Sequence, residues 1–148
     1  MTIALYMRNE AGRRGVPLQR SFASWINAIP ELRRRKAEVN ILVVGAEQGR
    51  YYNREFRGKD YATNVLSFRY EPAPGEKAAL LGDLVVCAPV VAREAVEQGK
   101  RVRDHYAHLT IHGVLHLLGY DHQSDAEAER MEALERRILA GLGIADPY

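Results

Sequence analysis

The sequence predicts a single α+β domain over residues 1–148, in which a mixed sheet of about four strands is covered by about five helices. Three observations predict this class. Runs of β-branched and aliphatic residues of strand length are separated by longer stretches with helical periodicity. A chain of 148 residues suits one domain with a substantial core. No internal repeat, low-complexity tract or linker divides it.

The N-terminal part is expected to form a strand, a loop and a helix. The segment 3–7 is short and largely apolar, which predicts a strand, and residues 9–15 are expected to form a loop. Pro17 suits the first turn of a helix that runs to about Ala28, and Pro30 stops that helix. The side chains that this helix would bury are Leu18, Phe22, Trp25, Ile26 and Ile29.

Two strands and a helix are expected in the middle of the chain. Residues 37–44 contain valine, isoleucine and leucine in a run typical of a buried strand. The ambiguous residues 47–56 are interpreted as a short helix, and the polar residues 57–63 as a loop. Alternation over residues 65–70 predicts another strand, and two prolines and a glycine predict a turn over 71–75.

The C-terminal half is predicted to hold one more strand and three helices. The strand covers residues 80–87, and helices follow over about 89–99 and 103–118. Ser124 followed by Glu127 is the pattern of a capping box, which predicts the start of the last helix. The apolar face of that helix consists of Met131, Leu134, Ile138, Leu139 and Leu142.

Composition is that of an ordinary globular protein. Hydrophobic residues make up 47% of the chain and charged residues 27%, and the net charge of +2 favours no class of partner. The basic run 33–36 is by itself more typical of a solvated surface than of a nucleic-acid site. Cys87 is the only cysteine, which fits a reducing compartment. No stretch approaches membrane-spanning length, so we expect a cytoplasmic protein without a membrane partner.

Three histidines within residues 112–122 carry the clearest chemical signal. His112 and His116 are four residues apart, so they lie on one face of a helix. Gly119 is expected to end this helix in a left-handed conformation and to turn the chain so that His122 meets the other two. Three converging imidazoles predict a site for one transition-metal ion at a helix end, most often zinc, although nickel, copper or iron would also be accepted.

The residue after the first histidine limits the chemistry. The spacing H-x-x-x-H-x-x-G-x-x-H is that of the metzincin proteases, in which a glutamate in this place acts as the general base. Here the residue is Gly113, which offers no base, so peptide hydrolysis by that mechanism is disfavoured. A metal ion lowers the pKa of bound water to about 7 without a protein base, which suits phosphodiester cleavage if a cation balances the phosphoryl charge.

Arg57 is the candidate catalytic residue for that charge, because a guanidinium group matches the geometry of a phosphate. From its place in a charged loop, a surface arginine paired with Asp60 or Glu55 is the simpler interpretation. Asp121, next to His122, could orient a histidine or help to move a proton, and a turn-capping role is an equal alternative.

Two more histidines precede the triad. His108 lies one turn before His112, and we expect it to pack or to support a ligand rather than to be a fourth ligand. His105 is expected at the surface or near the helix start, without a role.

From about Asn40 to the C-terminus, the sequence resembles the YbeY family of bacterial metal-dependent endoribonucleases. The resemblance extends beyond the histidines to several other segments, while two residues depart from the common pattern. Asn64 stands where many members have aspartate, and Arg69 where proline is common. The segments that carry the resemblance are 57–68, 81–86, 97–100, 142–143 and 146–148.

The resemblance implies a zinc site formed by His112, His116 and His122 and marks Arg57 as functionally important. It also implies cleavage of single-stranded RNA, with a part in maturation of the 3′ end of small-subunit ribosomal RNA and in ribosome quality control. The implied partners are ribosomal RNA, proteins of the small ribosomal subunit and a ribosome-assembly GTPase.

Three functions remain as alternatives on the sequence. The first is a metal-dependent endoribonuclease, whose activity could be weak alone and specified by a ribosomal partner. The second is a metallopeptidase-like hydrolase, against which Gly113 argues. The third is a non-enzymatic ribosome-assembly factor in which the metal mainly stabilises the turn after the helix.

Overall fold

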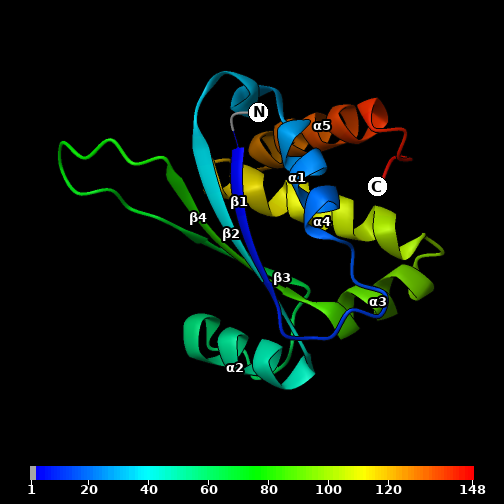
Figure 1. Ribbon diagram of the computed structural model, residues 1–148. Helices are drawn as coiled ribbons and strands as arrows, with labels where there is room; N and C mark the ends of the chain where they lie inside the picture. The colour runs from blue at the N-terminus through cyan, green and yellow to red at the C-terminus, as the bar shows by residue number, and fades with distance from the viewer. Residues whose placement is uncertain (1–2) are drawn as a thin grey trace.

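The computed structural model describes residues 3–148 (Figure 1). No helix in this part of the chain has the length and apolar character needed to cross a membrane. The elements follow one another as β1 (Ile3–Asn9), α1 (Gln19–Asn27), the 3-10 helix η1 (Pro30–Arg34), β2 (Ala37–Val44), α2 (Ala46–Arg57), β3 (Val65–Arg69), β4 (Leu80–Cys87), α3 (Ala88–Glu97), α4 (Val102–Leu117) and α5 (Asp125–Gly141).

One four-stranded mixed sheet organises the fold, as the sequence predicts. The strand order is β1-β2-β4-β3, with β1, β2 and β4 parallel and β3 antiparallel to β4. Helices α1, α4 and α5 gather on one face of the sheet, whereas α2 lies alone on the other (Figure 1). The main core lies between the sheet and the first group of helices.

Alternation along β2 explains why the two faces differ. Val39, Ile41 and Val43 are at most 2% exposed and face the main core, whereas Asn40 and Leu42 are only partly buried on the other face. A smaller cluster under α2 covers only part of that second face. A stretch of the sheet therefore remains accessible beside α2.

The predicted elements are confirmed, with corrections at their ends. Helix α1 begins at Gln19 rather than in the turn containing Pro17, so Leu18 is the residue before the helix and is 57% exposed instead of buried. Pro30 ends α1 as expected but also begins a 3-10 helix, which was not predicted. Arg57 is the last residue of α2, not the first of a loop, because the helix runs one residue further than predicted.

Helix α4 is the centre of the fold and packs unusually close to the sheet at Gly113. A Cβ atom on this glycine would lie 2.8 Å from Cδ2 of Leu84 and 3.3 Å from Oγ of Ser67. The Ser67 hydroxyl donates a hydrogen bond to the carbonyl of Gly113 across 3.2 Å. The glycine therefore allows helix α4 to lie close to strands β3 and β4. A larger residue at this position would hold the helix further from the sheet.

We predict that Gly113→Ala lowers the free energy of unfolding by up to about 2 kcal/mol. Overpacking against Leu84 costs about 1–3 kcal/mol, and the better helix propensity of alanine returns about 1 kcal/mol. Urea denaturation measures the difference. Gly141→Ala is the matched control, because Gly141 is also in a helix and no neighbouring atom lies within 4 Å of the place that its new methyl group would occupy. It should raise stability by about 0.5 kcal/mol, and a Gly113→Ala protein as stable as this control would contradict the prediction.

Candidate metal centre

The end of helix α4 brings the three predicted histidines together. His112 and His116 lie one turn apart on α4. Gly119 then takes a φ of 102°, and the backbone N–H of Tyr120 donates to the carbonyl of Leu115 across 3.0 Å. This is a helix end of the Schellman type, which a glycine favours. The reversal returns the following residues to α4, so the predicted role of Gly119 in the turn is confirmed.

His122 lies beside His116 and His112 after this turn. The two Nε2 atoms of His112 and His116 are 3.1 Å apart, and the ring centroid of His122 is 5.0 Å from that of His116 and 5.9 Å from that of His112. One nitrogen from each ring lies within 4.8 Å of the others, so the group could hold a metal ion. Burial lowers the pKa of His116, and so do His112 and His122, which favours the neutral imidazole that metals bind.

A buried carboxylate on helix α5 orients the first of these histidines. Oε1 of Glu135 lies 2.5 Å from Nδ1 of His112, and Oε2 lies 3.0 Å from Nε2 of His108. The Tyr148 hydroxyl donates a hydrogen bond to the same carboxylate. With Nδ1–H of His112 donating to Glu135, the lone pair of Nε2 points to the place where His116 also points, as in other carboxylate–histidine pairs at metals.

Glu135 is fully buried, yet it keeps its charge. Burial by itself would raise the pKa of this carboxyl group, but the hydrogen bonds with His108, His112 and Tyr148 outweigh burial and lower it to about 2. The pKa of Tyr148 is raised by its burial and by Glu135, so the phenol remains the donor. The side chain of Glu135 is therefore a permanent anion beside the histidines.

His108 supports the site rather than extending it, as predicted. His108, His112 and Glu135 form a second group whose atoms could hold a metal ion. These atoms are already at hydrogen-bond distance from one another, so we interpret the group as a hydrogen-bond network. Glu135 itself was not predicted from the sequence, although one signal was there: it lies four residues after Met131 and three before Ile138, a lone acid on the apolar face of α5.

Arg57 lines the same cavity as the histidines. This cavity of about 210 Å³ lies between the end of α2, strand β3 and helix α4. Of the simpler interpretation of Arg57, the surface position is confirmed, because Arg57 is exposed. The expected ion pair is wrong, because Asp60 binds Arg50 at 2.7 Å and Glu55 pairs with Arg54. Within residues 3–148, no carboxylate forms an ion pair with Arg57. Among the described residues, Arg57 thus lines the cavity without an ion-pair partner. We call this space the metal cavity, because the three histidines that could hold a metal ion also line it.

Asp121 bonds the backbone of the next residue, and its charge opposes the lowering of the His116 pKa that burial causes. Its Oδ1 accepts the backbone N–H of His122 across 2.7 Å. This bond fixes the backbone that carries the third ligand candidate.

Of the two positions expected for His105, the helix start is confirmed, because His105 lies in the first turn of α4, and the surface is wrong. His105 is 2% exposed, and its Nε2 lies 2.9 Å from Glu94 on α3. Asn64, which lines the metal cavity, donates to the same carboxylate across 3.0 Å. An aspartate in place of Asn64 would bring two carboxylates together here, so the departure from the common pattern suits this network.

Three comparisons with known proteins give the relatives of this chain. Residues 7–143 match the family model described as endoribonuclease YbeY. The chain is 61% identical to the endoribonuclease YbeY of Stenotrophomonas maltophilia strain R551-3 over 140 residues, which cover 92% of this chain and 87% of the relative. It is 58% identical to the protein of the same name from Xanthomonas axonopodis pv. citri, with the same coverage. The solution structure of TM1509 from Thermotoga maritima shares the fold, with a TM-score of 0.62 and 23% identity over 97% of this chain and 98% of that one.

We predict that Glu135→Gln weakens the affinity of the histidine group for added Zn²⁺ by about 10–100-fold. A neutral amide cannot accept from His108, His112 and Tyr148 together, so His112 loses its fixed orientation. Competition with a chelator of known affinity measures the change. Glu129→Gln is the matched control, because Glu129 lies exposed on the same helix. Equal zinc affinities of the two variants would contradict the orienting role of Glu135.

Proposed function

The chain belongs to the endoribonuclease YbeY family, and we propose that its endoribonuclease activity depends on one Zn²⁺ ion and acts on single-stranded RNA. In this proposal His112, His116 and His122 bind the ion, and Arg57 is the catalytic residue that contacts the phosphate. The observation that carries the proposal is the unpaired Arg57 in one small cavity with three convergent imidazoles.

The donor set suits zinc. Zinc in proteins bonds histidine nitrogen at about 2.0–2.1 Å, which in a tetrahedron separates two ligands by about 3.3 Å. The Nε2 atoms of His112 and His116 are 3.1 Å apart. Three imidazoles leave a fourth position for water, whose pKa zinc lowers to about 7. The lowered pKa of His116 favours its neutral ring, and the hydrogen bond between Nδ1 of His112 and Glu135 leaves Nε2 of His112 facing His116.

The other residues of the cavity bind and position the substrate. Arg57 would donate two parallel N–H groups to the non-bridging oxygens of a phosphate and so stabilise charge that develops there. Val65 and Ser67 of β3 line the same cavity as the histidines. A cavity of about 210 Å³ admits one phosphate group with part of its sugar. A flexible, unpaired strand can place a phosphate there more easily than a rigid duplex, which supports single-stranded RNA as the substrate.

The absence of a side chain at Gly113 weighs against the peptidase alternative. A glutamate at this position has no room, because Leu84 and Ser67 fill the space where its Cβ would lie. The site therefore lacks the base that the metzincin mechanism requires.

The biological part of the proposal rests on the family resemblance. We place the activity in maturation of the 3′ end of small-subunit ribosomal RNA and in ribosome quality control, in the cytoplasm. Proteins of the small ribosomal subunit and a ribosome-assembly GTPase would be the partners that direct a weak intrinsic nuclease to its target.

Removal of one metal ligand tests the metal dependence. We predict that His116→Ala abolishes zinc retention and RNA cleavage together, since two remaining imidazoles hold the ion poorly. Elemental analysis of the purified protein and cleavage of a labelled single-stranded RNA provide the two readouts. Cleavage at the wild-type rate by protein without metal would contradict the metal dependence. Absence of cleavage by zinc-loaded wild type would instead favour a ribosome-assembly factor that does not itself cut RNA.

Replacement of the arginine separates catalysis from metal binding. We predict that Arg57→Ala lowers the cleavage rate by about 10²–10³-fold, the effect of removing one preorganised charge donor, while the zinc content is unchanged. Arg54→Ala is the matched control from the same helix, since Arg54 is paired with Glu55 and Asp60. The same rate in both variants would show that Arg57 has no part in the reaction.

A further inference from the structure

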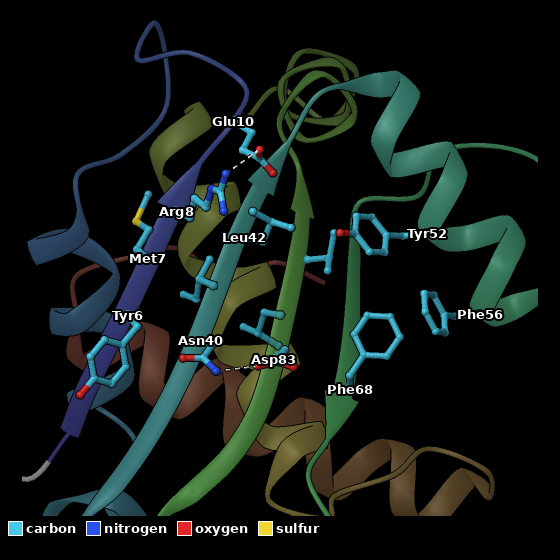
Figure 2. A pocket seen from close by; sticks show the side chains of 13 residues that line it. Tyr6, Met7, Arg8, Glu10, Asn40, Leu42, Tyr52, Phe56, Phe68 and Asp83 are labelled. Carbon is cyan, nitrogen blue, oxygen red and sulfur yellow. Dashed lines mark hydrogen bonds and ion pairs between the residues drawn. The ribbon is translucent and has the colours of Figure 1, made fainter.

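A second and larger cavity is a groove of about 680 Å³ on the sheet face that α2 leaves open (Figure 2). We call it the sheet groove. The side chains of Tyr52, Phe56 and Phe68 gather on one wall, and Tyr6 and Arg8 of β1 form the other (Figure 2). It lies outside the metal cavity, and the proposed reaction does not use it.

The sheet groove and the metal cavity share one thin wall. Two pairs of neighbouring residues build it, one at the end of α2 and one in β3. Phe56 lines the groove while Arg57 lines the metal cavity. Likewise Phe68 lines the groove and Ser67 the metal cavity, because successive side chains of a strand point to opposite faces. A chain that passes over this wall reaches both cavities.

Three aromatic rings on one wall of the groove lie outside the main core of the protein. Phe56 is 61% exposed, although its ring lies 5.2 Å from that of Phe68 and is stacked on Tyr52 at 6.1 Å. The main core does not include any of these three residues. Tyr52 and Phe68 are partly buried against the smaller cluster under α2, and Phe56 is the exposed ring beside them. A partly exposed group of aromatic rings offers a surface on which a flat ligand can stack.

The charges in the sheet groove favour an uncharged part of a ligand. Arg8 pairs with Glu10 across 3.5 Å. At the floor, the amide of Asn40 donates to Asp83 across 2.8 Å (Figure 2). No side chain among those lining the groove offers an unpaired cation for a phosphate, whereas Arg57 on the other side of the wall does. The groove thus suits nucleobases, and the metal cavity suits the phosphate.

We propose that the sheet groove holds unpaired bases of the RNA strand whose phosphate occupies the metal cavity, with a base stacked on Phe56 and Phe68. This inference rests on the proposed nuclease function and adds the path of the substrate to it. Aromatic side chains bind single strands in this way because every base has a π-face. A duplex keeps its bases stacked on one another, so the groove would also account for selection of single strands.

Binding of a fluorescent RNA tests the proposal. The full-length chain is titrated with a single-stranded RNA decamer containing 2-aminopurine, in EDTA so that the RNA is not cleaved. We expect the fluorescence to be quenched on binding and Phe56→Ala to weaken binding by about tenfold or more, the scale of one lost stacked base. Phe56→Trp should bind at least as tightly as the wild type. Tyr51→Ala is the matched control, since Tyr51 is 51% exposed on the same helix but does not line the groove.

A second RNA identifies the interaction. For a decamer with abasic sites in place of its central bases, the wild type and Phe56→Ala should bind equally, because the stacked group is missing. Unchanged RNA affinity of Phe56→Ala, or an equal loss for abasic RNA, would overturn the proposal and leave the groove to a protein partner. These results are independent of the nuclease. A wild type that binds with quenching in EDTA but does not cleave the same RNA when it is loaded with Zn²⁺ would contradict the proposed function alone.

Discussion

The close approach of helix α4 to the sheet at Gly113 is the constraint on which the site depends. Because no side chain separates the helix from Leu84 and Ser67, strand β3 lies within reach of the helix end and closes one side of the metal cavity. The same contact removes the position from which a protease of similar histidine spacing would supply its base. One packing requirement therefore both shapes the cavity and limits the chemistry that can take place in it.

Two charged side chains near the histidines differ in whether the protein supplies them with partners. Glu135 is fully buried, but donors from His108, His112 and Tyr148 satisfy it, so its charge serves to hold a ring in place. Arg57 has the opposite surroundings, since Arg50 and Arg54 already pair with the nearby carboxylates. An isolated guanidinium at a cavity gains a partner only when an anion enters, which in the proposed reaction would favour a phosphate over a neutral ester.

Much of the fold and the metal-ligand candidates could be predicted because the signals were local. The β-branched run of β2, the capping box of α5 and the glycine after α4 each follow from a few neighbouring residues. What could not be predicted depends on contacts between distant segments. His105 is buried where it meets Glu94 of another helix. Arg57 is left without an ion pair because Arg50, and not Arg57, binds Asp60. The exposure of Leu18 depended on a helix start displaced by two residues.

The thin wall between the two cavities has a consequence for how this protein can vary. Strand β3 pairs with β4 in a fixed register, from Val65 opposite Val86 to Arg69 opposite Gly82. An insertion or deletion of one residue in β3 would exchange the faces of Ser67 and Phe68. The phenyl ring would then enter the metal cavity, and the serine hydroxyl would lie in the sheet groove. The linings of the two cavities therefore depend on the same strand length. A substitution can change one cavity alone, but an insertion or deletion in β3 changes both.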